Sequence, residues 1–327
     1  MTSLWKIAIA IACVAVICGA AILWRVQRGK AVERKKLAEA ASLSRTRAEQ
    51  GDVRAQSELA SMYFYGRGVP QDYAEAARWS RKAADRGYAI AQDAVGVLYY
   101  EGKGVPQDYA EAIRWYRKAA DQGYAEAQYN LGYMCYKGQG VPQDYAEAGR
   151  WYRKAAHQGY AKGQYSLGIL YYYGQGVPQD YSETVHWYRK AADQGYAEAK
   201  YSLGILYYYG RGVPQDYTET VHWYRKAADQ GYAIAQFNLG EMYYHGRGMQ
   251  QDYAEAVRWY RRAADQGYAI AQYDLGTMYH QGKGVRQDYG EARRWYRRAA
   301  DQGDTNAQRA LSSIDQEQRR KYDPSSF

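Results

Sequence analysis

Small and apolar residues recur at helical spacing along most of the chain. In residues 124–159 a first stripe falls at i, i+4 and i+7 and consists of Ala127, Leu131 and Met134. A second stripe in the same segment consists of Ala148, Trp151, Ala155 and Ala156. The two stripes predict a pair of short helices, each of which buries one face.

The residues between the two stripes combine a helix stop with a helix start. Gly138 and Gly140 end the first helix, because glycine readily adopts the left-handed cap conformation, and Pro142 forces an extended connection. Asp144, with Glu147 three residues later, has the spacing of a capping box that opens the second helix. The phrase "GVPQDYAEA" therefore joins two helices at a corner.

This unit repeats every 36 residues. The seven full copies are 52–87, 88–123, 124–159, 160–195, 196–231, 232–267 and 268–303, and a half-repeat covers 304–320. A fixed period of this length is typical of solenoids, and helices of about a dozen residues are too short to be stable alone. The sequence therefore predicts an all-α, right-handed α-solenoid of paired antiparallel helices in the domain 52–320, with a disordered tail at 321–327.

The repeat resembles the Sel-1-like repeat, a relative of the tetratricopeptide repeat. Leu-Gly, Gly-x-Gly-Val, Asp, Trp-Tyr, Ala-Ala and Gly fall in register in "AEAQYNLGYMCYKGQGVPQDYAEAGRWYRKAAHQGY". The departures are Gln250 and Arg286 in place of Pro, Ala60 in place of Gly, and Cys135 in place of Tyr. The resemblance implies a scaffold for multiprotein assemblies. Some cysteine-rich relatives have been described as β-lactam-hydrolysing or penicillin-binding, but they carry a cysteine pair in each repeat, so that activity is not carried over and we expect no enzyme.

The N-terminal region differs from the repeats. Residues 7–24 are 18 residues without a charge, long enough for a transmembrane helix, and Trp5 and Trp24 lie at its ends. A short flank, 1–6, precedes it. A basic segment, 25–51, follows; because it is rich in Ala, Glu, Arg and Lys, we expect it to form a helical stalk. Because positive flanks tend to stay in the cytoplasm, we expect a cytoplasmic repeat domain. The alternative is a cleaved signal peptide with small residues at Cys18–Ala20, which would place the repeats in the periplasm or envelope.

One face of the first helix varies between copies and is the candidate partner-binding surface. Positions 3, 7, 10 and 14 of each copy share this face, which usually lines the concave side of paired-helix solenoids. The candidate residues, at positions 10 and 14, are Tyr65, Val97, Glu101, Tyr133, Lys137, Ile169, Tyr173, Ile205, Tyr209, Glu241, His245, Thr277 and Gln281. An aromatic ladder at position 13 runs beside them from Phe64 to His280. The alternative is that the ladder packs between repeats and the variable face is only solvated.

Residues suited to chemistry are scattered. His186 and His222 are one repeat apart, and no histidine has a Cys or carboxylate partner at ligand spacing, so we expect neither a metal nor a cofactor. Residues 1–50 account for most of the net charge of +9, which leaves the repeats near balance and argues against nucleic-acid binding. The sequence thus favours a membrane-anchored scaffold or adaptor that binds a protein or peptide, with an envelope protein that binds cell-wall or host components as the alternative. Ala15 and Gly19 form a small-xxx-small pair that would favour self-association in the membrane.

Overall fold

The computed structural model describes residues 32–321. The predicted flank 1–6, the transmembrane helix 7–24, the start of the stalk and the tail from residue 322 onward lie outside the described residues. From residue 32 onward, no described helix is both long enough and apolar enough to cross a membrane.

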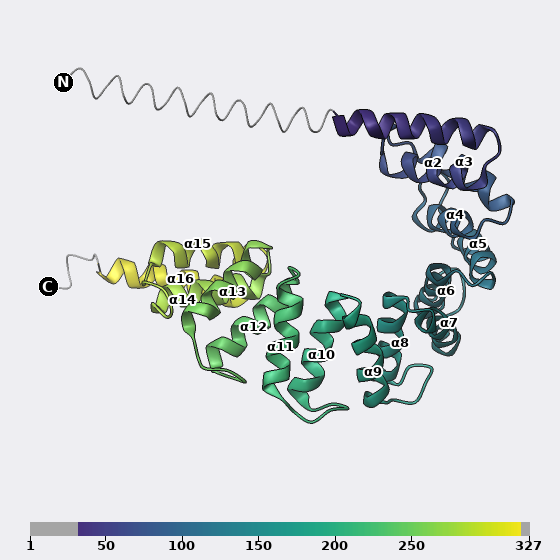
Figure 1. Cartoon of the computed structure of the whole chain (residues 1–327). Coiled ribbons are helices and arrows are strands. Elements are labelled where there is room, and N and C mark those ends of the chain that lie inside the picture. Colours follow the sequence, from purple (N-terminus) through teal and green to yellow (C-terminus); the bar gives the residue numbers. More distant parts are fainter. Residues whose placement is uncertain (1–31, 322–327) are drawn as a thin grey trace, which may run out of the picture. The chain divides into compact units, whose positions relative to one another are not determined.

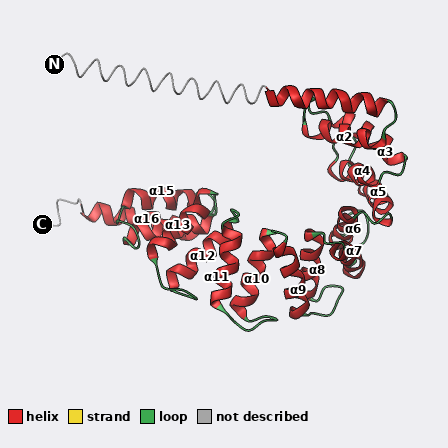
Figure 2. Ribbon diagram, viewed as in Figure 1, coloured by secondary structure: helices red, strands yellow, loops and turns green. Residues whose placement is uncertain are grey.

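Helices joined by short loops make up this part of the chain, and it contains no strand (Figures 1 and 2). Residues 32–49 form a helix ahead of the repeats. The first helices of the seven repeats are α2 (Val53–Tyr65), α4 (Ala89–Glu101), α6 (Ala125–Lys137), α8 (Ala161–Tyr173), α10 (Ala197–Tyr209), α12 (Ala233–His245) and α14 (Ala269–Gln281). The second helices are α3 (Tyr73–Asp85), α5 (Tyr109–Asp121), α7 (Tyr145–His157), α9 (Tyr181–Asp193), α11 (Tyr217–Ala228), α13 (Tyr253–Asp265) and α15 (Tyr289–Ala300). Helix α16 (Thr305–Lys321) follows the last repeat. The prediction of an all-α helical-repeat solenoid is confirmed.

The chain forms two compact units, and the boundary falls in the loop that precedes α7. The first unit ends at Asp144 and the second begins at Tyr145. Within each unit, every helix packs against the helices that come directly before and after it in sequence. Because the most extensive contacts run between helices that are neighbours in sequence, each unit has a series of small cores instead of one large core.

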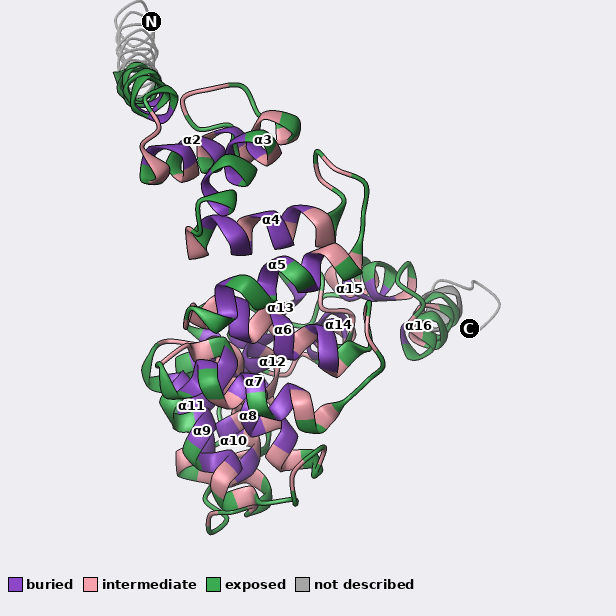
Figure 3. Ribbon diagram, turned by 90° about the vertical axis from the view of Figure 1, so that its right-hand side faces the viewer, coloured by how far each residue is buried: buried purple, intermediate pink, exposed green. Residues whose placement is uncertain are grey.

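The two predicted stripes form these cores. Ala127, Leu131 and Met134 of α6 are buried. In α7 the whole second stripe is buried, namely Ala148, Trp151, Ala155 and Ala156. Figure 3 shows the same pattern along the array, with buried positions on the helix faces that meet neighbouring helices and exposed positions on the faces turned outward. The helical spacing of apolar residues therefore identified the core-facing side of both helices.

The loop between paired helices ends one helix and starts the next, as predicted. Helix α6 ends at Lys137, and the capping residue that follows it, Gly138, has a left-handed φ of 69°. The start of the second helix is seen in the first repeat, at α3. There the Asp72 carboxylate accepts hydrogen bonds from the backbone N–H groups of Ala74 (2.9 Å) and Glu75 (3.0 Å). This cap satisfies N–H groups that have no partner within the helix.

Only one half of the predicted capping box forms. The N–H of Asp72 donates to the carbonyl of Tyr63 in the preceding helix (3.0 Å), and the Glu75 carboxylate accepts from the indole N–H of Trp79 (3.1 Å). Gln71, just before the cap, donates to the carbonyl of Phe64 (2.8 Å) near the end of α2. The glutamine and aspartate of "VPQD" therefore connect the second helix to the end of the first.

A glycine on each first helix after α2 allows the two helices of a repeat to approach closely. A Cβ added at Gly168 of α8 would lie 2.6 Å from two ring carbons of Tyr188 of α9, which is too close for any side chain. The first repeat has Ala60 at this position, and its second helix has Ser80 in place of the tyrosine. The alanine methyl group that the first repeat adds has room because the tyrosine ring of the other repeats is absent there, which explains the departure at Ala60.

Candidate functional site

The thirteen candidate residues divide into an exposed row and a half-buried row on the first helices. Position 14 is exposed in all seven repeats, and Tyr65, Tyr173 and Tyr209 retain 59%, 64% and 61% of their accessible surface. Position 10 is half-buried from Val97 to Thr277. Together with positions 3 and 7 we call these two rows the first-helix face.

The half-buried row also contributes to packing. Ile169 packs against the buried core that includes Leu203 and Val185, and Ile205 packs against the core that includes Leu239. The ring of Tyr133 contacts the ring of Tyr100, with 6.4 Å between centroids. These side chains therefore form the floor of the face, and the position-14 side chains stand above it.

The aromatic ladder at position 13 packs between repeats. The Tyr208 ring contacts the Tyr217 ring at 5.3 Å, and its hydroxyl accepts a hydrogen bond from Arg247, which lies in the Gly-x-Gly loop of the next repeat. The same arrangement recurs one repeat later, where Lys283 donates to the Tyr244 hydroxyl at 3.1 Å. The ladder thus joins neighbouring repeats, in agreement with the packing alternative.

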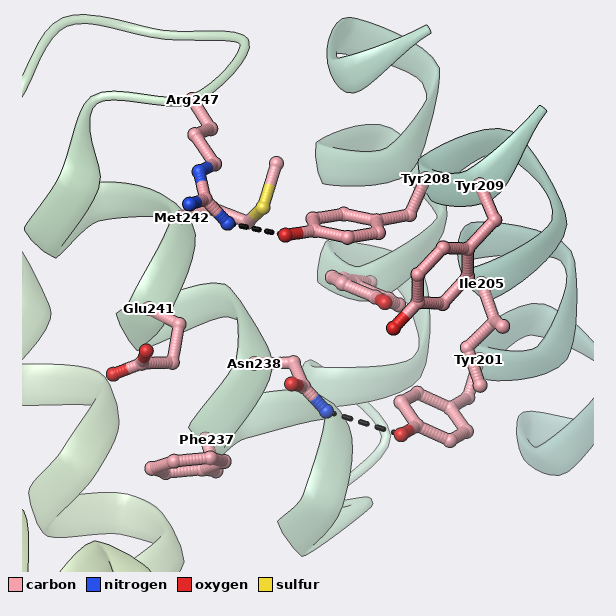
Figure 4. A pocket seen from close by; sticks show the side chains of 10 residues that line it. Tyr201, Ile205, Tyr208, Tyr209, Phe237, Asn238, Glu241, Met242 and Arg247 are labelled. Carbon is pink, nitrogen blue, oxygen red and sulfur yellow. Dashed lines mark hydrogen bonds between the residues drawn. The ribbon is translucent and has the colours of Figure 1, made fainter. Parts of the chain in front are cut away.

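Pockets form on this face where the first helices of adjacent repeats meet. One pocket, of about 250 Å³, lies between α10 and α12 (Figure 4). Tyr201, Tyr208 and Tyr209 of α10 line one side, and Phe237, Asn238 and Glu241 of α12 line the other, as the labelled sticks show. The Asn238 amide donates to the Tyr201 hydroxyl at 3.1 Å.

An equivalent pocket of about 370 Å³ lies between α4 and α6 in the first unit. Its lining includes Val97, Glu101 and Tyr133 from the candidate set, together with Tyr129 and Asn130. The same backbone positions therefore build both pockets, while their variable side chains give each pocket a different chemistry. Rows of small, aromatic-lined pockets of this kind suit the side chains of an extended peptide.

Acidic groups cluster near the C-terminal end of the face. Burial, helped by the nearby carboxylates of Glu241 and Asp304, raises the pKa of Asp274 to about 7. The Glu241 carboxylate accepts a hydrogen bond from Tyr260 and lies 3.5 Å from Nε2 of His245. From residue 32 to 316, no three His, Cys, Asp or Glu side chains are grouped as metal ligands would be.

The structure adds two kinds of lining residue that the sequence reasoning missed. The aromatic side chains at position 6, such as Tyr201 and Phe237, line the pockets although they were not among the candidates. So does Arg247, the middle residue of a Gly-x-Gly loop. The variation of that middle residue between Arg, Lys and Gln along the chain was a signal that pointed to it.

Seven consecutive segments of the chain match the Sel1 repeat: 53–88, 89–124, 125–160, 161–196, 197–232, 233–268 and 269–304. Each of these segments begins one residue later than the corresponding 36-residue copy defined from the sequence, the first of which is 52–87. No curated protein sequence matches the chain.

Two solved structures with clear sequence similarity share the fold. The chain is 41% identical to a protective antigen of uropathogenic Escherichia coli strains that displays an SLR fold, with a TM-score of 0.77; the match covers 84% of this chain and 59% of the antigen. It is 37% identical to a Sel1 repeat protein from Oxalobacter formigenes, with a TM-score of 0.70; the match covers 86% of this chain and 82% of that protein.

Yeast Tom70 is similar in fold alone, with 16% identity and a TM-score of 0.51 over 89% of this chain and 61% of Tom70. The matched repeats and the two closer structures agree on a helical-repeat scaffold. The chain is a member of the Sel1 repeat family, a non-enzymatic family of helical-repeat scaffolds whose repeats typically bind proteins.

Proposed function

We propose that this chain is a membrane-anchored adaptor that holds a protein partner on its first-helix face, with the membrane helix at 7–24 and the repeats in the cytoplasm. The observation that carries the proposal is the recurrence of a pocket between adjacent first helices in both units. A repeated pocket whose lining varies gives an extended partner several different side-chain contacts, and the sum of such contacts provides specificity.

The exposed tyrosines at position 14 supply the contact area. Tyr173 and Tyr209 are both largely exposed, and Tyr209 lines the pocket between α10 and α12. A tyrosine adds apolar area and a polar tip with few rotatable bonds, which is why it is enriched in protein interfaces. Each ring also contacts the ring of the tyrosine before it, with centroids 4.8 Å apart for Tyr172 and Tyr173 and 4.9 Å apart for Tyr208 and Tyr209. We assign the surface that these two side chains leave exposed to partner contact.

Site-specific photocrosslinking in the native host cell tests this proposal. A photoreactive phenylalanine analogue replaces Tyr173 or Tyr209 on the first-helix face, and His186 or His222 on the exposed side of the second helices in the same two repeats serves as the matched control. We expect one discrete crosslinked partner from positions 173 and 209 and none from positions 186 and 222. Crosslinks from the histidine positions alone would place the partner on the other face.

The anchor is tested separately. Protease treatment of membrane vesicles of known orientation, followed by N-terminal sequencing, reports both the location of the repeats and the retention of residues 7–24. Protection of the repeats in right-side-out vesicles, with the apolar segment retained, supports the cytoplasmic adaptor. Digestion from outside, or loss of the first twenty or so residues, favours the envelope protein that binds cell-wall or host components.

A further inference from the structure

The first two repeats lack an aromatic pair that the later repeats have. In the fourth to seventh repeats a ring at position 6 of the first helix packs on a tyrosine of the second helix, with centroids 5.0 Å apart for Tyr165 and Tyr188 and 5.5 Å apart for Tyr201 and Tyr224. The pairs Phe237–Tyr260 and Tyr273–Tyr296 are similar, at 5.7 Å and 5.6 Å. The first repeat has Ser57 and Ser80 instead, and the second repeat has Asp93 at position 6.

A pocket of about 230 Å³ occupies the space that the missing rings leave between α2 and α4. Phe64, Ile90 and Val97 form apolar parts of its wall, and Ser57, Ser80 and Asp93 supply polar groups. An apolar cavity of about 150 Å³ is enough to admit a benzene ring, so this pocket has room for a single side chain. The pocket lies entirely within the first unit.

The lining of this pocket carries charge of only one sign. Asp93 is 6% exposed, and its Oδ1 accepts a hydrogen bond from the Asn130 amide of α6 at 2.9 Å. The second charged side chain of the lining is Glu126, which lies on α6 with Asn130, whereas Asp93 lies on α4. The basic side chains of the adjacent loops are already engaged, because Lys103 lies 2.8 Å from the Glu101 carboxylate and Arg67 lies 4.9 Å above the Tyr65 ring.

We propose that this pocket receives an arginine side chain of the bound partner. The proposal rests on the proposed function, since it takes the first-helix face as the docking surface, and it adds the chemistry of one contact. The arginine stem would run along Ile90 and Val97, and the guanidinium group would reach the Asp93 carboxylate and the hydroxyls of Ser57 and Ser80. A guanidinium group fits because it offers five N–H donors in one plane and loses less hydration energy than an ammonium group.

The state of Asp93 makes binding depend on pH. Burial raises the pKa of this carboxyl to about 7, although the Asn130 donor opposes the shift. The other titratable groups that face it are Glu126 and Tyr124 at the start of α6 and Tyr116 of α5, and burial raises the pKa of both tyrosines. Since the guanidinium group pairs with the ionised carboxylate, binding should strengthen as the pH rises through 7.

Saturation-transfer difference NMR on the full chain in a non-ionic detergent tests the proposal, with N-acetyl-arginine amide as the probe. N-acetyl-citrulline amide, in which a neutral urea replaces the guanidinium group, is the matched control ligand. We expect the arginine probe to bind at least several-fold more tightly than citrulline, and about tenfold more tightly at pH 8 than at pH 6, because a carboxyl with a pKa near 7 is mostly ionised only at the higher pH. Equal binding of the two probes, no binding of either, or no pH dependence would overturn it.

Variants locate the effect. Asp93→Asn removes the charge, and Ser57→Tyr fills the pocket with the ring that later repeats carry at that position, so both should abolish the preference for arginine over citrulline. Asp121→Asn, at the exposed end of α5 in the same unit, should leave it unchanged. If Ser57→Tyr does not fold, the Asp93→Asn variant and the pH dependence of binding still test whether the pocket prefers arginine. Because the probe needs no partner, a negative result here overturns the arginine pocket alone, whereas failure of the photocrosslinking overturns the adaptor function.

Discussion

The two helices of each repeat are stabilised in different ways. Where the structure describes its cap, each second helix begins with an aspartate whose side chain accepts two backbone N–H groups, as Asp216 does for α11. The first helices after α2 begin at a tyrosine that makes no side-chain cap, as Tyr232 does for α12. They are connected to their neighbours instead: Gln236 of α12 donates to the carbonyl of Ala228 at the end of α11 and accepts from Gln266 beyond α13.

This difference explains why the variable positions lie on the first helices. The second helix keeps the same aspartate cap, tryptophan and Ala-Ala pair in every copy, and these residues specify its start and its buried side. The first helix is fixed by its glycine, leucine and glutamine contacts with the helices on either side. Its outward positions therefore carry few packing constraints, and they can differ from copy to copy without loss of the fold.

The largest test of this comparison is removal of a constant aromatic residue of the second helix. Trp187→Ala deletes a side chain that is 5% exposed and whose indole N–H donates to Glu183 at 2.9 Å. We expect a loss of about 3–5 kcal/mol, typical of deleting a buried large aromatic, seen as a lower midpoint in urea unfolding followed by circular dichroism. The neighbouring exposed His186→Ala should change stability by only about 0.5 kcal/mol. Similar effects for the two would mean that Trp187 is not a packing residue.

A second test concerns the close approach between the two helices of one repeat. Gly168→Ala places a methyl group against the Tyr188 ring and should cost about 1–3 kcal/mol through overpacking. In a Tyr188→Ser background, which reproduces the Ala60–Ser80 pair of the first repeat, the same change should cost nothing or stabilise the helix. A double-mutant cycle measures the coupling, and additive effects would show that the alanine and serine of the first repeat are unrelated.

The smallest expected effect is the loss of one cap. Asp216→Ala removes the acceptor for the N–H groups of Thr218 (2.8 Å) and Glu219 (3.0 Å) and should cost about 1 kcal/mol. Asp229→Ala at the other end of the same helix is the matched control, because a carboxylate at a helix C-terminus gains nothing from the helix dipole. The test compares the urea unfolding midpoints of the two variants. An equal loss of unfolding free energy in both would mean that the cap contributes no specific stability.

Local signals in the sequence were sufficient for the helix ends and the core stripes. Glycine conformation, the proline connection and the aspartate cap act within a few residues, so the corners around Gly138 and Asp72 followed from the chain alone. Helical spacing also predicts that positions 3, 7, 10 and 14 share one side of the first helix. Contacts between residues about one repeat apart, such as Arg247 with Tyr208, could not be predicted from the sequence. A repeat period identifies equivalent positions in each copy but not which of these positions contact each other.

The pairing of Ala60 with Ser80 illustrates the same limit. Comparison of the copies identified Ala60 as a departure from the glycine of the other copies, but it did not connect Ala60 with the serine that replaces a tyrosine at residue 80 of the second helix. Only the distance between Gly168 and the Tyr188 ring in a later repeat shows that the two changes concern one contact. The pocket at Asp93 depends on this local change in packing, which no helical period reports.

The second glycine of each Gly-x-Gly loop has a consequence for how such a coding sequence can change in length. Gly104, Gly212, Gly248 and Gly284 each lie against the backbone of the tyrosine that opens the second helix of the preceding repeat, namely Tyr73, Tyr181, Tyr217 and Tyr253. Recombination between two copies that adds or deletes a whole 36-residue unit brings the same glycine onto the same backbone, whereas a shift of one residue places a side chain there. The near-identical copies that share "YSLGILYYYG", from Tyr165 and from Tyr201, are the sequence record expected of a recent duplication within this constraint.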